Sequence, residues 1–152
     1  MGFASESLAG TLRVGGPCAA REVELDAAAL AALPEEHQVP DVGVMLSGRE
    51  GQAVRLAALY ELLRPSGARF VHVASADGGF TANLELERAL AQGLVLYARG
   101  GAPLPARLGG PFRLLLADGS GDCSINVKFL GRVLFLAEPG SHTARCADEP
   151  GS

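Results

Sequence analysis

Apolar positions along the chain fall in short runs, and most of these runs have the length and pattern of strands. We expect strands at residues 10–14, 22–25, 39–46, 69–75, 80–84, 94–98, 112–117 and 133–137. The run at 69–75 alternates and is rich in β-branched residues, which indicates a half-buried strand. Pro40 places the run at 39–46 at a sheet edge or a strand start, because proline cannot donate to a strand ladder.

Helical spacing occurs in fewer stretches. We expect helices at residues 27–33, 56–64 and 86–92, and one helical turn at 126–130. Asp26 is a good N-cap for the first helix, which Pro34 ends, and Gly93 closes the third. Strands and helices do not alternate regularly. The expected fold class is therefore α+β, with several short, mixed sheets layered with a few helices, rather than a doubly wound parallel sheet.

Length and composition are typical of one compact domain. The chain has 152 residues, of which 48% are hydrophobic. A chain of this length buries about 70% of its unfolded surface and needs no disulfide or metal to fold. We expect a single domain over residues 7–138. Residues 1–6 and 139–152 are small, polar and without periodicity, so both ends are expected to be flexible.

The charge balance limits the classes of partner. The net charge is −4, and no cluster of basic residues is present. Both features argue against a protein that binds nucleic acid or anionic membranes by neutralising phosphates. No apolar run reaches the ~18 residues of a membrane span, and no signal peptide is evident, so we expect a cytoplasmic protein. Lys128 is the single lysine.

Cysteine and histidine give no metal or disulfide pattern. Cys18, Cys123 and Cys146 are far apart, odd in number and without a C-x-x-C pair. The three histidines show no ligand spacing, so no metal ligand and no catalytic residue is assigned from the sequence. Cys123 lies within a Gly-rich, polar loop expected at residues 118–124, where a thiol could be either reactive or a small buried filler.

Residues 75–80 (Ser-Ala-Asp-Gly-Gly-Phe) follow a predicted strand and form the first candidate ligand loop. The candidate residues are Asp77, Gly78, Gly79 and Phe80. Glycine lets the backbone approach a ligand, and the carboxylate of Asp77 can accept a hydrogen bond from an amine or hydroxyl group. The alternative is an ordinary hairpin turn, since Asp-Gly is a strong turn signal.

The second candidate combines an arginine inside an apolar strand with the only lysine. Arg113 interrupts the run at 112–117, and a guanidinium is almost never buried without a partner. Asn126, Val127 and Lys128 offer an amide, backbone N–H groups and an ammonium group. Together these residues could hold a small anion such as a phosphate. The alternatives are a strand-end arginine in solvent and a connector whose lysine reaches water.

Taken together and in order, these segments resemble the molybdopterin-binding domain of sulfite-oxidase-type oxidoreductases. The resemblance covers residues 23–136. It is carried by residues 54–56 (Val-Arg-Leu), 75–80, 84–86 (Leu-Glu-Leu), 103–105 (Pro-Leu-Pro), 109–113 (Gly-Gly-Pro-Phe-Arg) and 126–130 (Asn-Val-Lys-Phe-Leu). It implies a mixed α+β fold and a molybdopterin cofactor. It also implies that Arg113 and residues 126–128 contact the pterin or its phosphate, while residues 77–80 line the same pocket.

The chain departs from the family pattern at two places. Catalytic members carry a molybdenum-ligating cysteine shortly before the Val-Arg-Leu segment, but residues 38–49 contain no cysteine. Valine or glycine cannot replace a soft thiolate ligand. Members commonly have Asp-His before the first glycine of the segment at 109–113, whereas this chain has Arg107 and Leu108. The resemblance therefore implies a cofactor pocket with an altered or inactive metal site.

Three hypotheses remain open at this stage. The first is a molybdopterin-binding protein with an altered metal site, which would need a separate electron carrier for any redox role. The second is a degenerate, non-catalytic member that binds no cofactor and acts as a binding or interaction module, or holds another small anion. The third is an unrelated enzyme with Cys123 as nucleophile beside Asp122 and Lys128, although no histidine stands in an obvious partner position.

Overall fold

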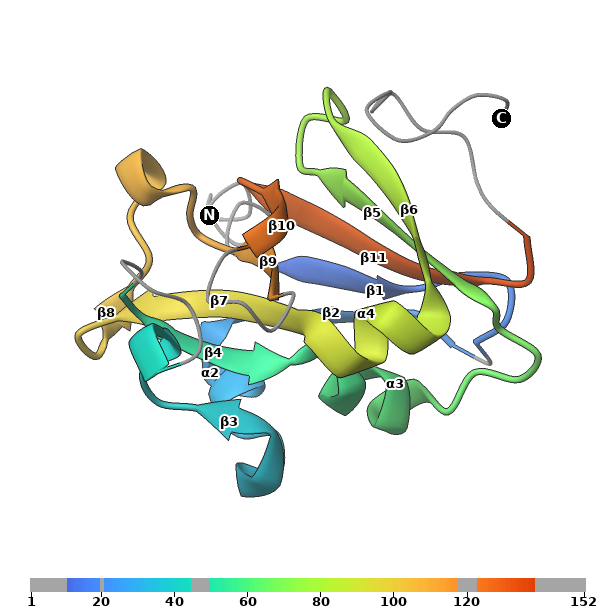
Figure 1. Cartoon of the computed structure of the whole chain (residues 1–152), viewed down its shortest axis with the longest axis horizontal. Coiled ribbons are helices and arrows are strands. Elements are labelled where there is room, and N and C mark those ends of the chain that lie inside the picture. Colours follow the sequence, from blue (N-terminus) through green and yellow to red (C-terminus); the bar gives the residue numbers. More distant parts are fainter. Residues whose placement is uncertain (1–10, 20, 45–49, 118–122, 139–152) are drawn as a thin grey trace, which may run out of the picture.

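The computed structural model describes residues 11–19, 21–44, 50–117 and 123–138, with the side chains of residues 117 and 123–125 left out. Within these ranges the chain forms two β-sheets accompanied by short helices (Figure 1). The α+β fold class expected from the sequence is confirmed. The two ends expected to be flexible, and parts of the predicted segments at 10–14, 39–46 and 118–124, lie outside the described residues.

The first sheet has five strands in the order β2-β1-β11-β5-β6. Its strands are β1 (Leu12–Gly15), β2 (Val23–Leu25), β5 (Phe70–Ser75), β6 (Thr81–Glu85) and β11 (Leu130–Leu136). β1 runs parallel to β11, and the other pairs are antiparallel. β11, the last strand in the sequence, therefore lies in the middle of the sheet and pairs with β1, the first strand.

The second sheet has the order β10-β9-β7-β4-β3, with β8 beside β7, and all its pairs are antiparallel. Its strands are β3 (Gln38–Val39), β4 (Gln52–Arg55), β7 (Gly93–Arg99), β8 (Ala102–Pro103), β9 (Arg113–Ala117) and β10 (Cys123–Val127). β10 is an edge strand of this sheet, as β6 is of the first.

The helices are short. They are α2 (Ala27–Ala31), α3 (Leu56–Leu63), α4 (Leu86–Gln92) and the 3₁₀ helices η1 (Glu35–His37), η2 (Val42–Val44) and η3 (Ala106–Leu108). Asp26 caps α2 as expected, because its Oδ1 accepts from the Ala29 amide at 2.8 Å. α3 packs against α4 (Figure 1). None of the helices in the described ranges is long and apolar enough to cross a membrane.

Two apolar clusters lie on opposite faces of the second sheet. On β7, Val95 and Tyr97 belong to the larger cluster, whereas Leu94 and Leu96 belong to the smaller one. Alternate residues of a strand point to opposite faces, so both faces of β7 are buried. The larger cluster also holds Phe135 of β11, which is fully buried and meets the Tyr60 ring edge-on at 5.7 Å.

Two sequence predictions are wrong. The helical turn expected at 126–130 is instead the end of β10, a turn and the start of β11. Asn126 and Val127 pair with Leu115 and Leu114 of β9, and this ladder holds them extended. Among the described residues of the strand predicted at 39–46, Val39 alone is in a strand, and Val42–Val44 form η2 instead.

The same region contains a strand that the sequence did not predict. β4 (Gln52–Arg55) immediately precedes α3 in the sequence and lies between β3 and β7 in the sheet. Within the segment predicted as a strand at 39–46, the Asp41 carboxylate accepts a hydrogen bond from the Gly43 amide at 2.9 Å, which favours a turn over a strand there.

Candidate ligand pocket

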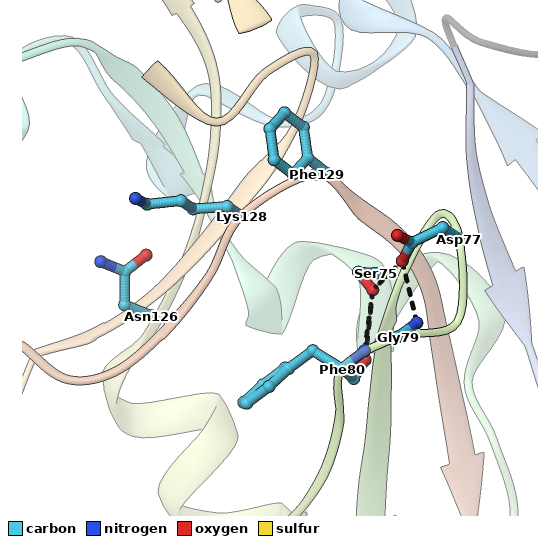
Figure 2. A pocket seen from close by; sticks show the side chains of 7 residues that line it. All are labelled: Ser75, Asp77, Gly79, Phe80, Asn126, Lys128 and Phe129. Atoms are coloured by element: carbon cyan, nitrogen blue, oxygen red, sulfur yellow. Dashed lines mark hydrogen bonds between the residues drawn. The ribbon is translucent and has the colours of Figure 1, made fainter. Parts of the chain in front are cut away.

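The turns after β5 and after β10 face each other across a pocket of about 430 Å³. The pocket is lined by Ser75, Asp77, Gly79, Phe80, Asn126, Lys128 and Phe129 (Figure 2). The two turns are joined by the Ala76 amide, which donates to the Phe129 carbonyl at 2.6 Å. Residues about 50 positions apart in the sequence are thus brought into one site by the pairing of β11 with β5.

The β5–β6 turn is fixed by the side chains of Ser75 and Asp77. The Asp77 Oδ1 accepts from the Gly79 amide at 2.8 Å and from the Ser75 hydroxyl at 2.8 Å, and the Phe80 amide donates to Ser75 Oγ at 3.1 Å. The hydrogen bonds from Gly79 and Ser75 stabilise the carboxylate, so the pKa of Asp77 lies below its ordinary value. Asp77 therefore presents a negative charge to the pocket at neutral pH.

On the opposite wall, the end of β10 and the turn that follows supply the residues that reach the pocket. Val127, the last residue of β10, is buried with 1% exposure, while Asn126 before it and Lys128 after it line the pocket. The next residue, Phe129, adopts a φ of +56° and is 45% exposed at the pocket.

Gly109 packs directly against the side chain of Lys128. Its φ is +92°, and an added Cβ would lie 3.0 Å from Lys128 Cγ and 3.1 Å from Arg113 Cδ. The Gly109 carbonyl also accepts from the Phe129 amide at 2.7 Å. The segment at 109–113 therefore supports the wall from behind. Glycine suits position 109 because its φ is positive and because Lys128 and Arg113 pack closely against it.

Arg113 lies behind the pocket wall and does not line the pocket. It is 9% exposed, and its Nε donates to Asn126 Oδ1 at 2.8 Å while Nη1 donates to the Leu108 carbonyl at 2.9 Å. A buried guanidinium needs such partners, and the protein itself supplies them. The structure thus joins Arg113 to the site through Asn126.

The structure brings five of the eight candidate residues to the pocket surface: Asp77, Gly79, Phe80, Asn126 and Lys128. Val127 and Arg113 lie beneath it, and Gly78 is in the turn with a φ of +76° but does not line the pocket. The candidate set did not include Ser75 or Phe129. A serine two positions before an Asp-Gly turn is a usable signal for Ser75, because serine and aspartate side chains both stabilise turns. No pattern marks Phe129.

The cysteine that is described lies far from this pocket. The Cys18 amide donates to the Phe135 carbonyl at 3.3 Å, near the far end of β11. Phe135 is five residues after Leu130, which at roughly 3.3 Å per residue is a separation of about 17 Å along the strand. The Cys18 thiol is therefore too far away to ligate a metal bound near Lys128. Cys123 begins β10, and its side chain is outside the described part of the chain.

One further group of ionisable residues comes together away from the pocket. The His37 Nε2 is 3.0 Å from Glu61 Oε1 and 3.7 Å from Glu36 Oε2. Among the described residues, this is the group of histidine and acidic side chains close enough to share an ion. Both glutamates are mostly exposed, and the contact links η1 to α3. Spacing could not reveal it, since Glu61 comes from a distant helix.

Comparison with known proteins identifies the family to which this chain belongs. The family model described as the oxidoreductase molybdopterin binding domain matches residues 43–144, more than half of the chain. The chain therefore belongs to the oxidoreductase molybdopterin binding domain family, as the sequence resemblance indicated. No curated protein matches the chain.

A solved structure shares the fold. The sulfane dehydrogenase SoxCD from Paracoccus pantotrophus superposes with a TM-score of 0.59 at 15% sequence identity. The match covers 86% of this chain but 39% of the SoxCD chain. This chain therefore corresponds to less than half of that protein, and at this identity the likeness concerns the fold alone.

Proposed function

We propose that this chain binds a molybdopterin-type pterin in the pocket between the β5–β6 and β10–β11 turns, with a metal site altered from that of catalytic relatives. The observation that carries the proposal is the pocket itself. In a member of a molybdopterin-binding family, residues from both candidate segments line one cavity. The proposal thus places in one pocket the two segments that the family resemblance had also grouped together.

The chemistry of the lining residues suits the organic part of such a cofactor. A volume of about 430 Å³ is within the range of small-molecule sites, which is ~300–1,000 Å³. Asp77 can accept from the N–H groups of a pterin edge, and Asn126 and Lys128 can donate to a phosphate. Phe80 and Phe129, exposed at 38% and 45%, offer apolar faces to a flat ring.

The same residues do not fit the metal. When bound in catalytic relatives, this cofactor supplies oxygen-atom transfer at a molybdenum that a cysteine thiolate also ligates. Residues 38–49 contain no cysteine, and Cys18 lies at the far end of β11. We therefore propose a role in binding or carrying the pterin, or an inactive member, rather than ordinary molybdenum catalysis. Any redox role would use a separate electron carrier.

The test is the pterin and molybdenum content of the protein, purified from a host that makes the cofactor. Fluorescence of the oxidised pterin and elemental analysis would both be expressed per protein chain. We expect pterin to approach one per chain and molybdenum to remain well below it. Lys128→Ala should lose the pterin, whereas Arg99→Ala, which removes a surface cation paired with Glu50, should keep it.

Each outcome has a distinct meaning. Well-folded protein without pterin would overturn the proposal and favour the second candidate, a degenerate module without cofactor, which the missing thiolate also favours. Molybdenum at one per chain would overturn the altered metal site. Added cofactor should also raise the Tm of apo protein, because a ligand that binds only the native state must stabilise it.

A further inference from the structure

The contact between Arg113 and Asn126 determines more than the position of a buried charge. An arginine side chain carries N–H donors and no acceptor. The Arg113 Nε lies 2.8 Å from the Asn126 amide group, so the atom that faces it must be the oxygen Oδ1. The usual ambiguity between the oxygen and nitrogen of an asparagine amide does not arise here, because the reversed amide would place two donors against each other.

This orientation decides what Asn126 can offer a ligand. With Oδ1 engaged by Arg113, the remaining group is the NH₂, which can only donate. Figure 2 shows Asn126 and Lys128 on one side of the view and Asp77 on the opposite side. One end of the pocket thus carries donors from Asn126 and Lys128, and the other carries the acceptor carboxylate of Asp77.

Arg113 is itself held firmly enough to impose the orientation. It is 9% exposed on β9, and its Nη1 donates to the Leu108 carbonyl at 2.9 Å. Its Cδ lies 3.1 Å from the position of a Cβ at Gly109, so the side chain is closely packed along its length. A rotation of the Asn126 amide would remove the acceptor from a buried guanidinium, which is strongly unfavourable.

We propose that Arg113 is a positioning residue: by engaging Asn126 Oδ1 it leaves the NH₂ as the group that Asn126 offers, so that the end of the pocket lined by Asn126 and Lys128 is specific for the oxygens of an anion. Asp77 correspondingly selects N–H donors at the other end. The inference rests on the proposed function only in that the same pocket binds the ligand. It assigns Arg113 an indirect role, in contrast to the direct contact that the family resemblance implies.

The decisive variant is Asn126→Asp. A carboxylate keeps the acceptor for Arg113, and therefore the fold, but has no donor for the ligand and adds a repulsive charge. We expect an unchanged or higher Tm together with at least about tenfold weaker binding of inorganic phosphate, the probe ligand. Asn83→Asp on β6 is the matched control. It makes the same chemical change at a residue that does not line the pocket, and it should bind phosphate like the wild type.

Nuclear magnetic resonance supplies a readout that a purely structural role would not change. The chain has two asparagines, Asn83 and Asn126, so labelling with ¹⁵N-asparagine leaves two side-chain NH₂ groups to assign, free of the signals of the three glutamines. Phosphate should shift the Asn126 NH₂ signals and leave those of Asn83 unchanged. In Arg113→Lys, which cannot make the same fork of bonds, we expect this shift to weaken along with the affinity.

The results separate this inference from the proposed function. If Asn126→Asp keeps the wild-type affinity, or if the Asn126 NH₂ does not respond to bound phosphate, the positioning role is wrong while pterin binding can still stand. If the wild type holds no pterin but phosphate binds and Asn126→Asp abolishes binding, the inference stands and the pterin proposal fails. If wild-type protein binds neither pterin nor phosphate, both are overturned. Phosphate bound at the nearby hollow that includes Arg13 and Arg132 would be unaffected by Asn126→Asp, and would count against the inference.

Discussion

At the scale of single residues, the pocket is built from side chains whose freedom the fold has largely removed. Asp77 is fixed by bonds from Ser75 and Gly79, and Asn126 by Arg113. Phe129 adopts a positive φ of +56°, a conformation that disfavours a residue with a Cβ. Such strain tends to persist at functional sites because the surrounding structure imposes it. The pocket therefore exists before any ligand arrives.

The depressed pKa of Asp77 predicts a pH dependence of stability. Because its pKa is lower in the folded than in the unfolded chain, the stabilisation is fully present above the unfolded value near 3.8 and is lost as pH falls through the folded value. We expect Asp77→Asn to have a lower Tm than wild type at pH 7, and the difference to vanish in acid below that range. Thermal unfolding in a pH series from 7 down into acid below the folded pKa of Asp77 would measure it.

Asp41→Asn is the control for this prediction, since it removes a carboxylate that holds one backbone amide in a similar turn away from the pocket. A Tm difference for Asp77→Asn that stays constant with pH would show that the carboxylate's charge contributes nothing to folding.

At the scale of elements, the site depends on close contacts between turns. The β10–β11 turn contacts Gly109 on one side and the β5–β6 turn on the other. A Cβ on Gly131, at the start of β11, would lie 2.5 Å from Ala76 Cα, so glycine is required there for the two turns to meet. The prediction of a helical turn at 126–130 failed for this reason: pairing with β9 and contact with these turns outweigh the local preference.

Gly109→Ala should reduce both stability and ligand binding. The change adds a Cβ at a φ of +92° and places it against Lys128 and Arg113, so we expect a loss of about 2–3 kcal/mol in the free energy of unfolding. Urea denaturation would measure this loss, and the pterin content would report the displaced lysine.

Gly67→Ala separates the cost of the positive φ from the cost of the contact with Lys128 and Arg113. Gly67 has a φ of +73° with nothing within 4 Å of an added Cβ, so it carries the backbone cost alone, about 1 kcal/mol. Equal losses in the two variants would mean that the contact of Gly109 with Lys128 and Arg113 has no energetic weight.

At the scale of the whole molecule, β11 holds the structure together. It lies between β1 and β5, and it leads from the pocket at Leu130 to the larger core at Phe135. The second sheet is buried on both faces, which explains why the strand at 112–117 reads as a continuous apolar run. The pocket lies where one edge strand, β6, begins and the other, β10, ends, between the turns that flank them.

Phe135→Ala should test this central role. Phe135 is fully buried against Tyr60, and truncating a buried phenylalanine costs about 3–5 kcal/mol. Phe129→Ala is the matched control, since Phe129 is 45% exposed and its truncation should cost less than about 1 kcal/mol of unfolding free energy. Denaturant midpoints of the two variants would compare them. Similar losses for both would refute the assignment of the core to the Phe135 end of β11.

The sequence by itself determined the elements whose signals are local. The Asp26 cap, the alternating strand at 69–75, the helix closed by Gly93 and the α+β class are each set by neighbouring residues, and the ordered motifs were enough to indicate the family. The tertiary structure alone decided which side chains of the two segments line the pocket, and that Arg113 bonds to Asn126 beneath it. The physical reason is that these relations depend on strand pairing and close packing between distant segments. No local pattern encodes which turn another turn will meet.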